Sequence, residues 1–469
     1  MLLLLQAAPL LLLLSLLLSG RAGPVPACLA ALAASLPAIL LTLPPGGGLL
    51  PFLAAESLRG AYLALQPIGV LAGGLLFHAA VTRLGPPDQA SLPATPRRVF
   101  AATLLAGTFV ESVTGFAVGG VFALAQLRRM GLLGTPAAAL ALMALVLVPW
   151  GGLGPGTALG AALIGVPPQA VALATAWPHA TWLLCLAPVF WRLCARAGVK
   201  VPGAEKLAQF GLMGLVAALL LAANLLLPFE AAGILASGLP LLWVLWRLDP
   251  PQGALGWRRA LLALAPWAGL AAALLLARSW HGAPAWKPFP TLPALPITHV
   301  AVVLALVSAL ILALRPRGVP RAVLAALTRA RRPALAMLLY VLLGRWLAGS
   351  GIAAGLAEQA GGALGPLAPY AMPVLGMVSG VVTGSNVGSN AALMPVQAAL
   401  GQAAGLPAAL AGGLHNFAGA AASGMSFAVT AMIAGLAGTS PAAIWRLLWP
   451  SLLAIPLVGW AWITLALFS

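Results

Sequence analysis

One acidic residue of this chain, Glu111, lies inside an apolar stretch, far from any run of charged residues. A carboxylate placed in the middle of a membrane costs about 2.5–3.5 kcal/mol, so such a residue is usually kept for a function. Burial disfavours the charged form of a carboxyl group, which would let Glu111 carry a proton at physiological pH. The alternative interpretation is structural: Glu111 would then pair with Arg128 or Arg129.

Two short polar motifs interrupt apolar segments and look like copies of each other. The first is GTFVESVTGF (107–116), followed by the tag GTPAAAL (134–140). The second is GVVTGSNVGSN (380–390), followed by the tag GLPAAL (405–410). Paired, glycine-interrupted apolar segments in the two halves of a membrane protein are typical of a transporter's binding site.

Hydroxyl and amide groups in and near these motifs are suited to binding a small anion. A broken helix leaves free backbone N–H groups at its new N-terminus, where the helix dipole favours negative charge. Uncharged polar groups beside glycine suit a carboxylate better than a metal or a phosphate. The alternative is that small residues merely allow close helix packing, but two copies in matching positions favour a site. The predicted substrate-binding residues are Ser112, Thr114, Gly115, Thr383, Gly384, Ser385, Asn386, Ser389, Asn390 and Asn416.

The sequence gives a weaker indication of a basic side chain that could pair with the substrate's negative charge. Arg345 lies within the apolar span 333–349 and is a candidate counter-ion, although its side chain could equally extend to the membrane interface. His78 and His179 are interpreted as helix-packing residues. The sequence contains no Ser-His-Asp set, zinc-ligand spacing or phosphate loop, which argues against an enzyme, and no cofactor or metal site is predicted.

Composition places most of the chain in lipid. Of its 469 residues, 62% are hydrophobic and only 7% are charged, too few to cover the surface of a water-soluble protein. The net charge of +17 comes from short basic clusters between apolar stretches, which is the positive-inside pattern of a multi-pass membrane protein. Nucleic-acid binding is not expected, because no basic surface with interleaved aromatic residues is present.

The basic clusters predict which side of the membrane each loop faces. Clusters around 83–98, 128–129, 192–206, 247–259 and 315–332 are all consistent with the cytoplasm, while Arg59, Arg278 and Lys287 fall on the outer side. Only about thirty residues separate Arg98 from Arg128, too few for two full crossings. The segment 99–127 is therefore predicted to be a re-entrant hairpin with its tip near 111–115.

The second motif predicts a second hairpin, over 366–402, that is inserted from the outer side. The preceding spans, 61–82 and 333–349, also run in opposite directions. The predicted fold is therefore an all-α multi-pass membrane protein of about twelve transmembrane helices, with two inverted repeats that each contain a re-entrant hairpin. Each hairpin is followed by a further broken segment, 149–156 in the first half and 419–424 in the second.

The chain is accordingly divided into four parts. Residues 1–60 form N-terminal spans, 61–200 the first transport repeat, 201–332 a scaffold, and 333–469 the second, inverted repeat. The first apolar run, 1–20, is interpreted as an uncleaved span rather than a signal peptide because it lacks a basic n-region. No soluble domain is predicted.

At these motifs the chain resembles the L-lactate permease family of bacterial proton-coupled transporters. The segments GTFVESVTGF (107–116) and TGSNVGSNAAL (383–393) are similar to that family's two signatures. The resemblance implies that Glu111 matches the family's acid and Asn390 its closing Asn. Two departures stand out. Asn386 replaces an expected Asp, and Gly424 stands where a Lys-Met pair usually begins, so an ion pair near the site would be lost without a change of net charge.

The resemblance implies a permease for small monocarboxylates such as L-lactate or glycolate, with proton symport, in the bacterial inner membrane. The predicted partners are the organic anion, the co-transported proton and the lipid bilayer, and the oligomeric state (monomer or homo-oligomer) is left open. One alternative is a Na⁺-coupled or exchange carrier of another small organic anion. The other is a membrane-embedded enzyme or assembly subunit, which the short, acid-poor loops disfavour.

Overall fold

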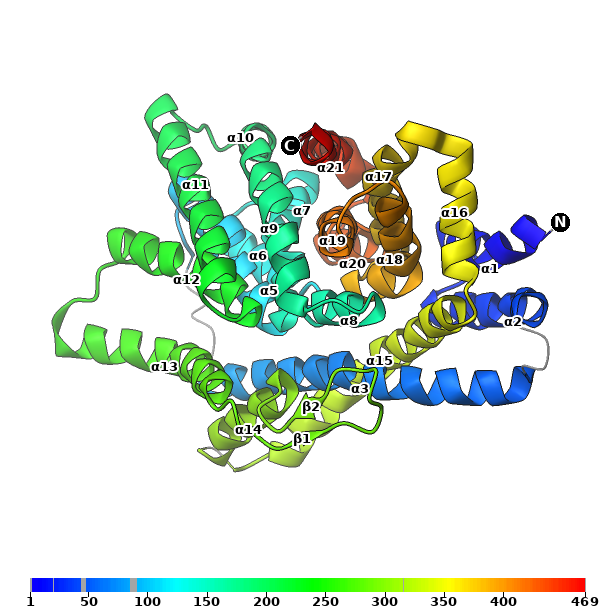
Figure 1. Cartoon of the computed structure of the whole chain (residues 1–469). Coiled ribbons are helices and arrows are strands. Elements are labelled where there is room, and N and C mark those ends of the chain that lie inside the picture. The colour runs from blue at the N-terminus through cyan, green and yellow to red at the C-terminus, as the bar shows by residue number, and fades with distance from the viewer. Residues whose placement is uncertain (1, 20, 44–47, 85–90, 315, 469) are drawn as a thin grey trace.

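Helices make up nearly the whole chain in the computed structural model, which describes residues 2–19, 21–43, 48–84, 91–314 and 316–468 (Figure 1). Met1, Gly20 and Arg315, which belong to the segments considered above, lie outside the described residues. In chain order the elements are α1 (Leu2–Leu18), α2 (Pro24–Thr42), α3 (Leu49–Thr82), α4 (Pro96–Phe100), the π-helix η1 (Ala101–Gly107), α5 (Thr108–Thr114), α6 (Val118–Arg129), α7 (Gly134–Leu142), the 3-10 helices η2 (Met143–Leu145) and η3 (Val148–Leu153), α8 (Pro155–Leu163), α9 (Pro168–Cys185), α10 (Ala187–Arg196), α11 (Gly203–Leu226), α12 (Phe229–Leu248), α13 (Gly253–Ser279), β1 (Ala285–Trp286), β2 (Leu295–Pro296), α14 (Val300–Ala313), α15 (Val319–Gly349), α16 (Ile352–Leu364), η4 (Gly365–Leu367), α17 (Ala368–Thr383), α18 (Asn386–Ala403), α19 (Ala408–Ser423), α20 (Phe427–Ala437) and α21 (Pro441–Phe468).

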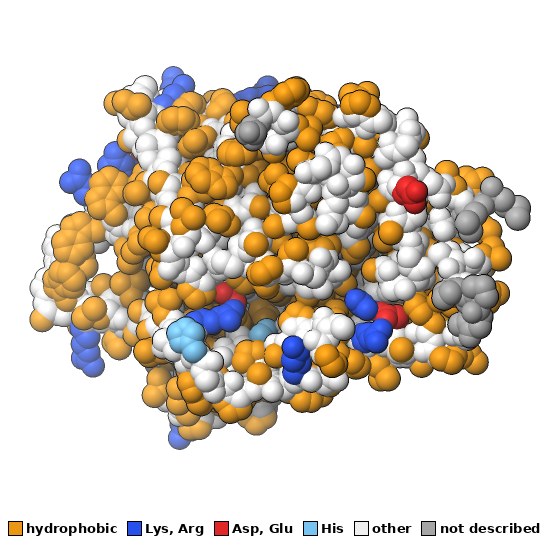
Figure 2. Space-filling view, in the orientation of Figure 1, with side chains coloured by type: hydrophobic (Ala, Val, Ile, Leu, Met, Phe, Trp, Pro, Cys, Tyr) orange, Lys and Arg blue, Asp and Glu red, His pale blue; other side chains and the backbone are white. Residues whose placement is uncertain are grey.

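The predicted class, an all-α multi-pass membrane protein, is confirmed. Within the described residues, nine helical segments are long and apolar enough to cross a membrane. Figure 2 shows hydrophobic side chains over most of one face, with few charged groups among them. The figure of twelve spans stays a prediction.

The long helices α3 and α15 pack against each other in opposite directions. At one end, Glu56 of α3 forms an ion pair with Arg345 of α15. At the other end, the guanidinium of Arg83 donates to the carbonyl oxygen of Gly318 at 3.1 Å. Both helices extend beyond the predicted spans 61–82 and 333–349, so the predicted boundaries at 61 and 333 fall inside helices.

The first hairpin consists of α4, η1 and α5 on one arm and α6 on the other. The chain enters and leaves the hairpin at the same end: the N–H of Leu92, just before α4, donates to the carbonyl oxygen of Arg129, the last residue of α6, at 3.0 Å. Its tip is the non-helical stretch 115–117, in which Gly115, Phe116 and Ala117 all have positive φ.

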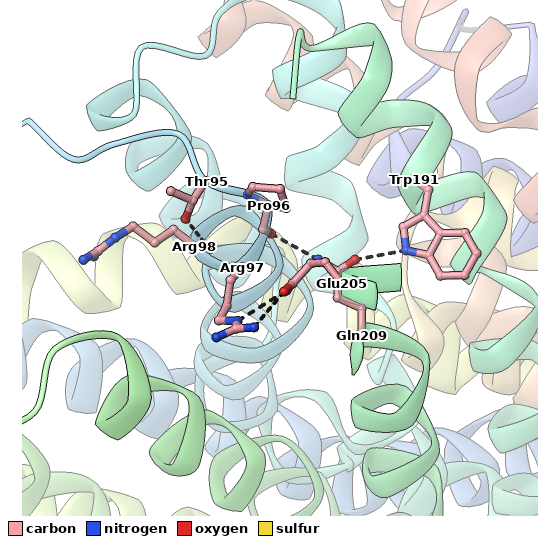
Figure 3. A network of polar contacts seen from close by, with 7 residues as sticks. All are labelled: Thr95, Pro96, Arg97, Arg98, Trp191, Glu205 and Gln209. Atoms are coloured by element: carbon pink, nitrogen blue, oxygen red, sulfur yellow. Dashed lines mark hydrogen bonds and ion pairs between the residues drawn. The ribbon is translucent and has the colours of Figure 1, made fainter. Parts of the chain in front are cut away.

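The base of this hairpin is fixed to the neighbouring helices (Figure 3). Arg97 pairs with Glu205 at 2.7 Å, while Gln209 donates to the carbonyl oxygen of Pro96 and accepts from Trp191. Arg98 pairs with Asp249, at the end of α12, at 2.7 Å. The loops after α3, before α11 and after α12 therefore lie on one side of the molecule, as the basic clusters predict.

The second hairpin consists of α17 and α18, joined at 384–385. The two hairpins are inserted from opposite ends of α21, a helix of 28 residues that is about 42 Å long. In the last turn of α20, which leads into the start of α21, the carbonyl oxygen of Leu436 accepts from Arg128 of the first hairpin. Near the end of α21, Trp460 donates to the carbonyl oxygen of Tyr370, in the second hairpin, at 2.7 Å. Insertion from opposite ends is what an inversion of the two halves requires, and the inversion itself stays a prediction.

A second interruption follows each hairpin. In the first half α7 ends at Leu142, earlier than the predicted span 132–149, and the chain continues as η2 and η3 before α8. Pro149 has no N–H to donate, and Gly152 and Gly154 adopt positive φ, so a continuous helix is not formed here. In the second half α19 ends at Ser423 and α20 begins at Phe427.

Close helix contact within the second repeat depends on Gly380. A Cβ on Gly380 would lie 2.0 Å from the carbonyl oxygen of Gly419 on α19, whereas a Cβ on Gly435 of α20 would meet no atom within 4 Å. Because overpacking typically costs about 1–3 kcal/mol, we expect Gly380→Ala to lower the thermal unfolding midpoint of the purified protein. Gly435→Ala is the matched control and should leave the midpoint unchanged or raise it, since alanine favours helix. Equal midpoints for the two variants would contradict the close contact.

Candidate functional site

The two hairpin tips and the two broken segments that follow the hairpins all line one cavity, which has a volume of about 740 Å³. The first hairpin contributes its tip, and the second hairpin contributes the residues around 384–385. The remaining wall comes from the broken segments after each hairpin, from the start of α2 and from α15. The lining residues used below are Glu111, Gly115, Phe116, Ala117, Gly156, Arg332, Tyr340, Thr383, Gly384, Ser385, Asn386 and Gly424.

Glu111 occupies the tip of the first hairpin. It is 4% exposed, and its carboxylate accepts the N–H groups of Ala117 at 3.1 Å and of Gly119 at 3.0 Å. These N–H groups belong to the start of α6, so the carboxylate occupies the positive end of that helix. Gly119 is required for this approach, because a Cβ there would lie 2.2 Å from the carbonyl oxygen of Gly107.

The tip of the second hairpin has the same form but no acid. Gly384 has φ +66°, and the Ser385 hydroxyl accepts the Gly388 N–H at 3.4 Å as the N-cap of α18. In a helix the first N–H groups, here those of Asn386 and Val387, have no intrahelical acceptor. None of the seven acidic residues occurs within 380–390. This helix N-terminus therefore faces the cavity without an internal counter-anion.

Behind the second tip, buried amides connect the two halves of the protein. Asn416 of α19 accepts from Asn386 at 3.0 Å and from Asn390 at 2.8 Å, and donates to Thr157 at 3.0 Å and Thr175 at 2.9 Å. Asn390 also donates to the carbonyl oxygen of Gly156 at 2.9 Å. The network fixes the second hairpin against α8 and α9 of the first half.

The predicted site residues fall into three groups in the structure. Six line the cavity, and three lie in the buried layer behind the second tip. The cavity-lining residues are Glu111, Gly115, Thr383, Gly384, Ser385 and Asn386, and the buried ones are Ser389, Asn390 and Asn416.

The remaining predicted residues point elsewhere. The hydroxyls of Ser112 and Thr114 donate to the carbonyl oxygens one turn earlier in α5, at 2.9 and 2.7 Å. Arg345 is held in the ion pair with Glu56 and is not among the residues that line the cavity.

Two cavity residues were not predicted, Arg332 and Tyr340, both on α15. Arg332 is exposed at the mouth, where it is the basic side chain that lines this cavity. In the sequence it belongs to the cluster 315–332, which was assigned to the cytoplasm, so nothing distinguished Arg332 from its basic neighbours. The stretch 23–26, next to Arg21, lines the same mouth. By the positive-inside rule, this is the side of the molecule that is predicted to face the cytoplasm.

A comparison with known protein families finds a match that covers the second motif but not the first. Residues 290–468 match the family model described as L-lactate permease, so the resemblance to that family is confirmed over this part of the chain. The matched range includes the second motif (380–390) but not the first (107–116). No curated protein matches the chain.

Among solved structures, the chain is similar to the YdaH transporter of Alcanivorax borkumensis, whose crystal structure reveals an unusual topology. The two share 18% sequence identity at a TM-score of 0.43, over 92% of this chain and 89% of that one. This likeness is too distant to support a functional assignment.

Proposed function

We propose that the protein is a secondary active transporter that moves a small monocarboxylate, such as L-lactate or glycolate, together with a proton. The observation that carries the proposal is the difference between the two hairpin tips. Both present a helix N-terminus to the same cavity, but the first is occupied by the carboxylate of Glu111 and the second is not. The second tip is thus suited to a carboxylate from outside the chain.

Substrate recognition would involve the second tip. The carboxylate would accept the N–H groups at the start of α18, and Ser385 and Asn386 border the same space. Thr383 also lines the cavity, but its hydroxyl donates to the carbonyl oxygen of Ser379 at 2.7 Å. These are uncharged groups around a helix N-terminus, a donor set that fits one carboxylate better than a phosphate. Asn390 and Asn416 would keep Asn386 in place rather than contact the substrate.

Proton coupling would involve Glu111. In its ionised form the carboxylate is held by two N–H groups of α6, and the same side chain borders the cavity. A proton on Glu111 would remove one negative charge from a cavity that must also hold the substrate's charge. Joint binding of the proton and the anion is therefore electrostatically favoured over binding of either one alone.

Alternating access would follow from movement of the hairpin-bearing elements against α3 and α15. The cavity opens on the side of Arg332, which the basic clusters predict to be cytoplasmic, so this arrangement would be an inward-facing state. The predicted inverted repeat would supply the geometry of the opposite state.

Sodium coupling is the second candidate, and one observation favours it. Among the described residues, the Oδ1 atoms of Asn386 and Asn390 are buried and accept no hydrogen bond. Free amide and carbonyl oxygens are ligands for hard cations. A carrier that binds Na⁺ behind the second tip would need no acid there.

Uptake of labelled L-lactate by proteoliposomes tests the proposal. Inward proton and sodium gradients are imposed separately, with glycolate and a dicarboxylate as comparison substrates. We expect uptake to follow the proton gradient and to be competed by glycolate but not by the dicarboxylate. Uptake that follows only the sodium gradient would favour the second candidate. An absence of lactate uptake by folded, inserted protein would contradict the monocarboxylate assignment.

A further inference from the structure

A small polar pocket lies on the other side of the broken segment from the large cavity. It is lined by Gln66 of α3, Glu230 of α12 and His299 at the start of α14, together with apolar residues that include Leu153 and Pro155. Pro155 lines the large cavity as well, so the chain around Leu153 and Pro155 is the partition between the two spaces. The pocket measures about 20 Å³, which is room for one water molecule.

The pocket is at the outer end of the molecule. Glu230 is in the first turn of α12, whereas the opposite end of that helix is followed by Asp249, which pairs with Arg98 on the cytoplasmic side. Arg278, which pairs with Glu230, is one of three basic residues that the positive-inside rule leaves on the outer side. Figure 2 shows acidic, basic and histidine side chains close together on one face of the molecule.

The polar groups of this pocket are incompletely paired. Glu230 is 7% exposed and forms an ion pair with Arg278 through Oε1, while its Oε2 has no hydrogen-bond partner. The Nε2 of Gln66 is buried and also has none. His299 accepts the Ala301 N–H through Nδ1 at 3.2 Å, which leaves Nε2 as the donor of its neutral ring. Burial, with Arg278 nearby, lowers the pKa of His299 to about 4, so the ring is neutral at pH 7.

The helix that carries Glu230 also packs against the elements that hold Glu111. A Cβ on Gly233, one turn after Glu230 on α12, would lie 2.8 Å from the Trp150 side chain and 2.9 Å from the Ser112 hydroxyl. Ser112 directly follows Glu111. The start of α12 therefore packs against both the partition and the first hairpin.

We propose that Arg278 is the outer capture site for the substrate's carboxylate, which takes the place of Glu230 on the guanidinium. The donors of Gln66 and His299 complete the site. The displaced Glu230 takes up one proton from the external water as its O–H bond forms, so one anion and one proton are bound together. Because the closed pocket holds only one water, Glu230 and Arg278 must separate before the substrate can pass the partition. The inference rests on the proposed function.

The test compares transport from the two sides of right-side-out membrane vesicles. We expect Arg278→Gln to raise the KM for lactate applied outside at least tenfold, while the KM for lactate exported from inside changes less than twofold. Glu230→Gln should remove the dependence of the external KM on external pH. Lys287→Gln is the matched control, because it removes an exposed basic residue on the same side, whereas Arg278 forms the ion pair with the pocket residue Glu230.

The possible outcomes distinguish a failure of the outer capture site from a failure of the proposed transport function. Equal changes in the two KM values, or none, would overturn the capture site while leaving the transporter intact. An absence of monocarboxylate transport by the wild type would overturn the proposed function, and with it the carboxylate part of this inference.

A second measurement is independent of the substrate. Ala158 lines the pocket, and Ala158→Cys, with Cys28, Cys185 and Cys194 replaced by serine, is treated with a membrane-impermeant thiol reagent from outside. Neutralising both Glu230 and Arg278 should speed the labelling several-fold, and an unchanged rate would show that this ion pair does not close the outer side.

Discussion

Glu111→Gln is expected to abolish lactate uptake driven by a proton gradient, with a loss of at least about 100-fold in rate, equivalent to roughly 2.7 kcal/mol. Glutamine resembles the protonated side chain in shape but can neither release nor take up a proton. One of its two terminal atoms is an N–H₂ group that cannot accept the N–H of Ala117 or Gly119, as the carboxylate does. Initial rates in proteoliposomes, with and without the gradient, measure the effect.

Exchange of internal for external lactate separates coupling from folding. If Glu111 carries the proton, Glu111→Gln should retain exchange within about tenfold of the wild type, because exchange needs no net proton movement. Glu358→Gln is the matched control, since Glu358 is an exposed acid on α16 away from the cavity. Gradient-driven uptake that survives in Glu111→Gln would remove this residue from the coupling step.

Because Gly424 leaves no Lys to pair with a new carboxylate in this chain, Asn386→Asp is expected to raise the KM for lactate on the order of 100-fold. The new carboxylate would lie at the N-terminus of α18, where the substrate's carboxylate is proposed to bind. Two negative charges about 4 Å apart repel each other by roughly 4 kcal/mol at an effective dielectric constant near 20, and screening reduces that figure. Aspartate is favourable at a helix N-terminus, but it cannot donate to Asn416 as the amide of Asn386 does. The thermal unfolding midpoint of the variant is therefore measured alongside the KM.

The position of the charge is tested by Gln402→Glu. This control adds one negative charge to the exposed, opposite end of the same helix and should leave the KM within about twofold. The effect of Asn386→Asp should also diminish as the external pH falls, because protonation removes the added charge. An unchanged KM in Asn386→Asp would contradict a substrate carboxylate at this tip.

The two departures from the L-lactate permease pattern lie at the same cavity. Asn386 and Gly424 both line it. The amide of Asn386 donates to Asn416 at 3.0 Å, a bond that an ionised Asp could not make. A Cβ on Gly424 would lie 2.8 Å from the carbonyl oxygen of Leu145, so a larger side chain would require a local shift. The exchange of both residues is therefore consistent with the loss of a charged pair across the site.

Much of the architecture could be predicted from the sequence alone. Apolar runs must lie in lipid as helices, because unpaired backbone groups there are costly. The spacing of Arg98 and Arg128 leaves no room for two crossings, and the contact between Leu92 and Arg129 shows the resulting hairpin. Glycine-rich interruptions marked the breaks, because each break needs a backbone conformation that glycine adopts readily, as at Gly115 and Gly384.

Which polar residues face the cavity was decided only by the tertiary structure. Thr114 and Thr383 each precede the glycine at the tip of their hairpin, yet Thr383 lines the cavity and Thr114 is not among its lining residues. The pairing of Arg345 with Glu56, and the placement of Arg332 at the mouth, depend on how α3 and α15 cross. The physical reason is that sequence spacing fixes where a helix breaks, whereas the direction of each side chain at the break depends on packing between segments hundreds of residues apart.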